Sequence, residues 1–218
     1  MKPLKLKNYY SEEQPELNMK QSRSKKTYDA LISAGFKLLK KQEYDSITVA
    51  EVSKLAGYSV GAFYGRFQSK DELFYAMVNH HFTIRYKKLE RLFSTLYDKN
   101  FVDELIKDIV KYYWTNRSFW RAALARRMYD SEFWAPVKMS GDSITVSFIT
   151  RLSELTNRPL TDTEEENIHF GFQLMGGIIN NMVVNEPGPV PMKQKVFVEK
   201  LTRAFRLVTD YDNILKVK

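Results

Sequence analysis

The chain has 218 residues, of which 44% are hydrophobic, and it contains no cysteine. This composition excludes wholesale disorder, disulfide bonds, thiolate catalysis and cysteine-ligated metal sites. The net charge is +8, and it is uneven: residues 1–95 contain 17 Lys and Arg against 10 Asp and Glu, which indicates a polyanionic partner unless the excess is only a solvated surface.

The N-terminal segment, residues 1–22, shows no sustained periodicity and contains Pro3 and Pro15. We expect a flexible arm, because disorder concentrates at chain termini, although such arms also enter a DNA minor groove. The segment has no apolar core of a secretion signal, and no stretch of the chain approaches the roughly 18 consecutive apolar residues of a membrane span. We therefore expect a cytoplasmic protein without a membrane partner.

A first helix is predicted over residues 24–41. Its apolar positions follow the i, i+3, i+4, i+7 spacing of a single buried helix face. These positions are Tyr28, Leu31, Ile32, Gly35, Leu38 and Leu39.

The segment from Thr48 to Lys70, TVAEVSKLAGYSVGAFYGRFQSK, predicts two short helices around a glycine turn. Thr48 and Glu51 have the T-x-x-E spacing of a capping box, which marks the start of the first of these helices. Gly57 is placed to end that helix in a left-handed conformation, and Ser59 can cap the next one. The second helix starts with small residues before its aromatic residues and an arginine, a combination that fits a DNA groove.

The run GYSVGAFYGRFQSKDELF resembles the helix-turn-helix of the TetR family of transcriptional regulators, whose usual pattern is G-V-S-x-G-x-L/F-Y-x-x-F-x-S-K-x-x-L. The resemblance covers about residues 24–78. Tyr58 stands where the family usually has valine, and Gly65 stands where a larger residue is common; these departures leave the base preference open but not the fold. The matching positions are Gly57, Ser59, Gly61, Phe63, Tyr64, Phe67, Ser69, Lys70 and Leu73.

The resemblance and the residue chemistry together predict contacts to DNA. Lys70 and Tyr64 are assigned to phosphates, and Arg66 either makes a bidentate contact to guanine or clamps a phosphate. Gly61 permits close approach, and Ala62 can touch a thymine methyl group, whereas Phe63 and Phe67 are expected in the core. The predicted DNA-binding residues are Thr48, Val60, Gly61, Ala62, Tyr64, Gly65, Arg66 and Lys70.

A long helix is predicted to begin after Ser69, which forms a second capping box with Glu72. Neither proline nor glycine interrupts it as far as Phe93, so it can transmit a rigid displacement. In the family this helix connects the DNA-binding head to the body.

The rest of the chain predicts further helices and no alternating strand pattern. The expected helices cover residues 101–114, 118–129, 143–155, 161–185 and 192–211, with Pro136 as an interruption after Trp134. The fold class is therefore all-α with about nine helices. The predicted domains are a helix-turn-helix domain over residues 23–70 and an effector-binding and dimerisation domain over residues 71–218.

The last two long helices carry broad apolar surfaces that are suited to self-association, with an ordinary monomer core as the alternative. Family members pair through their last helices, so the resemblance favours a homodimer. The predicted interface residues are Phe172, Met175, Ile179, Met182, Phe197, Leu201, Phe205 and Val208.

An aromatic-rich stretch in the body predicts a pocket for an effector, with a packed aromatic core as the alternative. Such a pocket suits a hydrophobic or cationic compound. The candidate residues are Trp114, Trp120, Arg121, Tyr129, Phe133, Trp134, Gln173 and Asn180.

The resemblance implies a repressor that a small-molecule effector releases from a pseudo-palindromic operator on double-stranded DNA. A ligand-independent architectural DNA-binding protein is the alternative. An enzyme is not expected: the neighbouring His80 and His81 point about 100° apart on a helix, and His169 stands alone. We expect no cofactor and no metal.

Overall fold

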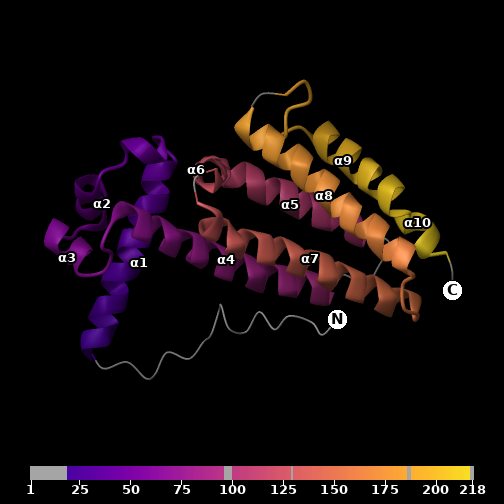
Figure 1. The fold of residues 1–218 in the computed structure, drawn as a ribbon, viewed down its shortest axis with the longest axis horizontal. Helices are drawn as coiled ribbons and strands as arrows, with labels where there is room; N and C mark the ends of the chain where they lie inside the picture. The colour runs from indigo at the N-terminus through magenta and orange to yellow at the C-terminus, as the bar shows by residue number, and fades with distance from the viewer. Residues whose placement is uncertain (1–18, 96–99, 129, 186–187, 217–218) are drawn as a thin grey trace. The chain divides into compact units, whose positions relative to one another are not determined.

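The computed structural model describes residues 19–95, 100–128, 130–185 and 188–216, and within these ranges the regular structure is entirely helical, as predicted (Figure 1). The helices in chain order are α1 (Met19–Leu39), α2 (Val49–Ala56), α3 (Val60–Tyr64), α4 (Lys70–Thr95), α5 (Phe101–Thr115), α6 (Arg117–Arg127), α7 (Ser131–Thr156), α8 (Asp162–Val184), α9 (Lys195–Thr209) and α10 (Tyr211–Ile214), with a 3-10 turn, η2 (Tyr44–Ser46), after α1. One helix expected over residues 192–211 is in fact two, because Asp210 takes a left-handed conformation with φ of 52°.

Two compact units make up the chain, and the division falls inside α4, between Ile84 and Arg85. The helix itself runs without a break across this point. The predicted division after residue 70 follows the end of the sequence motif and stays a prediction.

The first unit is built around the aromatic residues of the helix-turn-helix. Phe63 and Phe67 are buried, as predicted, and the ring of Tyr28 in α1 lies 5.2 Å from that of Phe67. Gly35 of α1 faces Met77 of α4, where a Cβ atom on the glycine would lie 2.5 Å from the methionine sulfur. The buried face predicted for α1 is therefore the face that contacts the rest of this unit.

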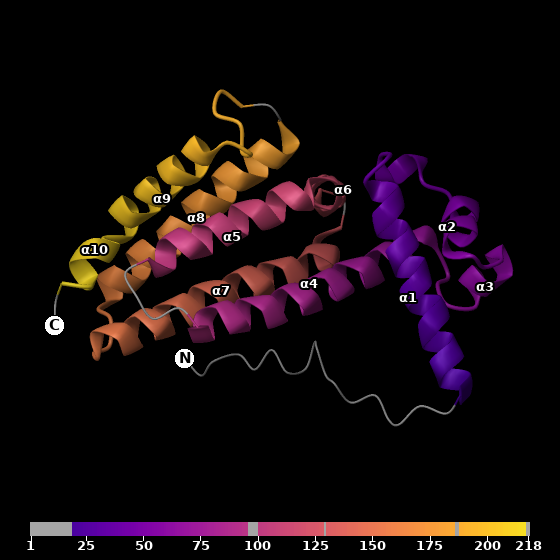
Figure 2. The same cartoon turned by 180° about the vertical axis from the view of Figure 1, so that it is seen from behind.

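The second unit is a helical bundle in which α8 and α9 run side by side and α5 packs against both (Figures 1 and 2). A set of rings holds these helices together. Phe148 of α7 stacks on Phe101 at 5.5 Å and meets Phe205 edge-on at 5.7 Å. All three of these side chains are buried.

Gly171 sets the close approach of α8 and α9. A Cβ atom at this position would lie 2.5 Å from Cγ2 of Thr209 and 3.3 Å from the ring of Phe205. By contrast, Cβ atoms at Gly176 and Gly177 would meet nothing within 4 Å. Close packing inside one chain thus explains the first glycine of α8 and leaves the other two unexplained.

The residues predicted for the dimer interface lie mostly inside the single chain, which corrects the sequence-based assignment. The side chains of α8 and α9 chosen for their apolar spacing pack against each other, as the 5.1 Å contact between Phe172 and Phe205 shows. Buried side chains are unavailable to a second chain in this conformation. The buried ones are Met175, Ile179, Met182, Phe197, Leu201 and Phe205, while Phe172 and Val208 are half-buried.

The interruption predicted at Pro136 is absent, because α7 continues through it to Thr156. A proline removes one backbone donor from a helix, and this cost is offset where the helix is held by packing. Phe133 and Phe148, on either side of Pro136, are both buried. Tertiary contacts therefore outweigh the local preference of the proline.

Candidate nucleic-acid interface

The helix-turn-helix is fixed locally by caps that the sequence predicts. Thr48 Oγ1 accepts a hydrogen bond from the amide of Glu51 at 3.2 Å, and the Glu51 carboxylate accepts one from the amide of Thr48 at 2.8 Å. This hydrogen bonding to Thr48 lowers the pKa of the Glu51 carboxyl group. Gly57 ends α2 with φ of 78°, in the left-handed conformation that glycine adopts without strain.

The next helix, α3, starts at a second cap and presents one face to solvent. Ser59 Oγ accepts a hydrogen bond from the amide of Ala62 at 3.1 Å. Phe63 is buried in the core, whereas Val60 and Tyr64 are exposed; the Tyr64 side chain is 56% exposed. The exposed face of α3 is therefore mostly apolar and ends in a phenol.

Gly61 and Gly65 are not required by the packing of the unit itself. A Cβ atom at Gly61 would come no closer than 3.8 Å to another atom, and one at Gly65 no closer than 3.6 Å. Neither glycine has the left-handed conformation that excludes other residues. The missing side chains therefore leave open surface beside Tyr64, where another molecule can approach the backbone.

Arg66 lies just beyond α3, in the turn that leads to α4, rather than on the helix as the sequence suggested. Its guanidinium is exposed and donates from Nη1 to the carbonyl oxygen of Gly65 at 2.7 Å. This hydrogen bond holds the Arg66 guanidinium next to the backbone of Gly65.

Lys70 is the first residue of α4 and is half-buried. Its Nζ donates to the carbonyl oxygens of Tyr44 at 3.1 Å and Asp45 at 3.2 Å, and it lies 4.5 Å from the centre of the Tyr44 ring. The Tyr44 hydroxyl donates to the carboxylate of Asp71 at 2.6 Å. Lys70 thus has a structural role that the sequence did not indicate, since it ties η2 to the start of α4.

The cap predicted for α4 forms with a different reciprocal partner. Ser69 Oγ accepts a hydrogen bond from the amide of Glu72 at 3.1 Å. The Glu72 carboxylate, however, accepts from the amide of Gln68 instead of Ser69. The helix start is as predicted, and the capping box is shifted by one residue.

The residues proposed for an effector pocket are only partly brought together. Trp120 is buried in α6, with the ring of Trp134 at 6.5 Å, and Phe133 is buried beside Trp134 in sequence. Arg121 Nε donates to the carbonyl oxygen of Val183 at 3.5 Å. Of the remaining candidates, Tyr129 lies outside the described residues, Gln173 is exposed, and Trp114 and Asn180 are half-buried.

Sequence reasoning missed an ionisable side chain next to these rings, that of Arg85. It lies in α4 and is buried, and its guanidinium carbon is 4.2 Å from the centre of the Tyr112 ring. The signal was present, because Val78, Phe82, Arg85 and Leu89 follow the i, i+4, i+7, i+11 spacing of one buried stripe.

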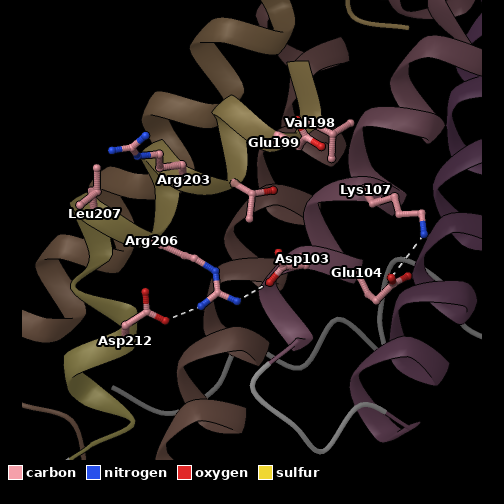
Figure 3. Close-up of a pocket in the computed structure, with 10 residues that line it drawn as sticks. Asp103, Glu104, Lys107, Val198, Glu199, Arg203, Arg206, Leu207 and Asp212 are labelled. Atoms are coloured by element: carbon pink, nitrogen blue, oxygen red, sulfur yellow. Dashed lines mark hydrogen bonds and ion pairs between the residues drawn. The ribbon is translucent and has the colours of Figure 1, made fainter. Parts of the chain in front are cut away.

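A cleft of about 500 Å³ lies elsewhere in the second unit, between α5, α9 and α10. Figure 3 shows Arg206 at its floor, where it forms ion pairs with Asp103 and Asp212. Lys107 pairs with Glu104 at 3.3 Å in the same cleft. These ion pairs occupy most of the charged groups of the cleft, and Arg203 also lines it.

In the described ranges no group of three or more His, Asp or Glu side chains is arranged to hold a metal ion. Likewise, none of the helices in the described parts of the chain has the length and apolar character needed to cross a membrane.

The geometry of the first unit agrees with comparisons to known proteins. The profile described as "Bacterial regulatory proteins, tetR family" matches residues 31–77, which include the whole helix-turn-helix. The helix-turn-helix segment of the chain is therefore similar to that of TetR-family regulators. The uncharacterised HTH-type transcriptional regulator YwcC of Bacillus subtilis is 44% identical over 55 residues, a match that spans about 25% of each chain.

Solved structures resemble a larger part of the chain. A putative TetR-family transcriptional regulator from Mesorhizobium loti aligns with a TM-score of 0.65 and 18% identity, covering 89% of this chain and 98% of that one. GusR of Salmonella enterica aligns with a TM-score of 0.62 and 13% identity, covering 84% and 95%. At these identities the likeness extends the TetR-family fold to the second unit and says nothing of ligands.

Proposed function

We propose that this protein is a homodimeric, sequence-specific DNA-binding transcriptional regulator, a repressor that a small-molecule effector releases from its operator. The observation that carries the proposal is the exposed face of α3. It pairs a firmly capped short helix with two glycines, Gly61 and Gly65, that the packing of the protein does not require. Open backbone on a short exposed helix is what close approach to a base-pair edge needs.

Charge supports the same surface. The excess of basic residues lies in residues 1–95, and Arg66 lies next to α3. Phosphate contacts position a protein on DNA and base contacts give it specificity, so both kinds of group are needed close together. Tyr64 and Lys70 are proposed for phosphates, Arg66 for a guanine or a phosphate, and Val60 and Ala62 for the groove. Thr48 adds its hydroxyl at the start of α2.

The homodimer is proposed through the face of α8 that remains exposed, in place of the buried stripe. Phe170, Leu174, Gly177, Asn181 and Val184 follow the i, i+4, i+7, i+11, i+14 spacing of one helix face. Phe170 and Val184 are each more than half exposed, and Gly177 has open space around it. Small residues on such a face let two helices approach closely, and a two-fold dimer matches a pseudo-palindromic site.

Footprinting the purified protein on DNA that flanks its own gene tests the proposal. We expect protection of one pseudo-palindrome whose half-sites lie about one helical turn, 10 base pairs, or a multiple of it apart. Protection without symmetry would contradict the dimer, and uniform protection along the fragment would indicate an architectural protein instead.

A further inference from the structure

A buried cationic cluster lies in the second unit beside the aromatic rings. Arg85 of α4 is only 3% exposed, and its Nη1 pairs with Oδ2 of Asp108 in α5. Lys88, one turn further along α4, pairs with the other oxygen of the same carboxylate and is 59% exposed. Two cations therefore share one carboxylate, and the buried member of the three, Arg85, depends on Asp108 to offset its charge.

The carboxylate is held in its charged form, so protonation does not change this balance near neutral pH. Burial acts to raise the pKa of the Asp108 carboxyl group, but hydrogen bonds from Lys88 and Arg85 outweigh it and lower the pKa. An arginine carries five N–H donors. Among the described residues, Asp108 is the one hydrogen-bond acceptor found for Arg85. Donors remain on this guanidinium for a second anionic group.

The surroundings of Arg85 are aromatic. Its guanidinium lies over the Tyr112 ring, and the neighbouring Tyr113 stacks on Trp120 with 4.4 Å between ring centres. Burial, partly opposed by the charge of Arg85, raises the pKa of Tyr113 to about 12, so its hydroxyl stays neutral. These rings pack against one another next to the Arg85 guanidinium, with Trp120 buried among them.

The adjoining helix adds further positive charge. The 11 residues of α6 include four arginines and no acidic residue. Two of them lie over tryptophan rings: Arg117 over Trp114 at 4.6 Å and Arg127 over Trp134 at 5.1 Å. Arg126 pairs with Asp130 at 3.7 Å. An added cation would meet repulsion here, whereas an anion would not.

We propose that the effector of this protein is an amphipathic carboxylate, with its carboxylate on Arg85 and its apolar body against Tyr112, Tyr113 and Trp120. The inference rests on the proposed regulatory function and replaces the hydrophobic or cationic compound expected from the sequence. A planar guanidinium matches a carboxylate in a bidentate geometry, which a neutral amide cannot reproduce. An incoming carboxylate competes with Asp108 for Arg85 and so acts on the contact between α4 and α5.

The charge preference can be measured on the wild-type protein without DNA. The probes are matched triplets on one apolar scaffold: phenylbutyrate, phenylbutanamide and phenylbutylamine, and likewise decanoate, decanamide and decylamine. All three tryptophans of the chain, Trp114, Trp120 and Trp134, lie in α5, α6 and α7, so intrinsic fluorescence reports on this region. We expect the carboxylate of each triplet to bind about tenfold more tightly than its amide or amine.

Equal or tighter binding of the amide or the amine would overturn the proposal, and so would the absence of carboxylate binding up to about 5 mM. Arg85→Gln should abolish the preference for the carboxylate while leaving amide binding unchanged. Because this variant removes the buried partner of Asp108, circular dichroism is recorded first to check the fold. The exposed Lys88→Gln serves as a second variant that should reduce the preference about threefold. The control Lys107→Gln removes an exposed charge elsewhere on α5 and should leave the preference intact.

The outcomes separate this inference from the proposed function. A protein that binds its operator but shows no carboxylate preference contradicts the effector assignment alone. A protein that prefers carboxylates but ignores every operator-like duplex contradicts the regulatory function and leaves the anion site standing.

Discussion

Arg66 is placed where it can contact either a guanine base edge or a phosphate of DNA. The side chain follows directly after α3 and is exposed, and within the described part of the chain it donates to the carbonyl of Gly65. We predict that Arg66→Ala costs about 1–3 kcal/mol on the correct operator and relaxes the preference at one base pair. Competition titrations with single-base operator variants measure this, and equal loss on every sequence would make Arg66 a phosphate contact.

Lys70 ties η2 to α4, and a salt titration tests whether it also contacts a phosphate. Its ammonium group has three donors, of which two bind the carbonyls of Tyr44 and Asp45. If the third reaches a phosphate, Lys70→Gln lowers the slope of log affinity against log salt by about one. A fall in melting temperature with an unchanged slope would show that the residue only ties η2 to α4.

The contrast between Gly57 and Arg85 shows why local features of single residues are predictable. The left-handed end of α2 depends on Gly57 and its neighbours in sequence, so the sequence suffices to place it. Arg85 owes its importance to Asp108 and Tyr112, which lie more than 20 residues away on another helix. No periodicity within one helix identifies such partners.

At the scale of elements, the packing of α8 on α9 depends on a single missing side chain. Gly171→Ala places a methyl group 2.5 Å from Thr209 Cγ2. We predict a loss of about 1–3 kcal/mol in the free energy of unfolding, measured by urea denaturation. Thr209→Ala in the same chain should recover part of this loss. The control Gly141→Ala, in open space on α7, should be neutral or stabilising, and equal effects at both glycines would contradict the steric explanation.

An ion pair at the start of α8 makes the stability of the protein depend on pH in the acid range. Arg158 donates to both carboxylate oxygens of Glu164 at 2.6 and 2.8 Å, and this contact lowers the pKa of the carboxyl group to about 2. A lowered pKa in the folded state stabilises the protein above the ordinary value of about 4.5, and this contribution is lost as the pH falls towards 2.

We therefore predict that Glu164→Gln is less stable than the wild type at pH 7 and loses less stability between pH 5 and about 2. Thermal melts across this range measure the difference. The exposed Glu166 on the same helix serves as the control, and Glu166→Gln should melt as the wild type does at each pH. Identical pH profiles of the wild type and Glu164→Gln would contradict the account.

The residues at which helices start could be predicted from the sequence, whereas the helix face that is buried could be predicted less well. The capping boxes at Thr48 and Thr161 need only residues three positions apart; both form, and the one at Thr48 was expected. On α8 two apolar stripes lie side by side, and their spacing alone does not say which one packs against α9. The structure buries the stripe of Met175 and Ile179 and leaves Phe170 exposed. Pro136 inside α7 is a further case in which packing decides against local preference.

At the scale of the whole molecule, the continuous helix α4 runs from the unit that contains the helix-turn-helix into the second helical unit. The pairs of Arg85 and Lys88 with Asp108 attach the later part of this helix to α5, while its first residue, Lys70, attaches to η2. A ligand that acts on Asp108 and Arg85 therefore acts on the same helix that carries Lys70, the residue proposed to contact a phosphate.

The central claim, that the exposed face of α3 lies against a duplex, is tested most directly by fluorescence anisotropy. The measurement compares an operator duplex from the flank of the gene with a scrambled duplex, for the wild type and for Val60→Glu at modest ionic strength. Val60 is exposed at the first turn of α3, so a glutamate there is compatible with the fold but repels phosphates. We predict that the wild type prefers the operator by at least about 10³-fold and that Val60→Glu loses this binding. Equal binding of the two duplexes by the wild type, or undiminished binding by the folded variant, would contradict the account.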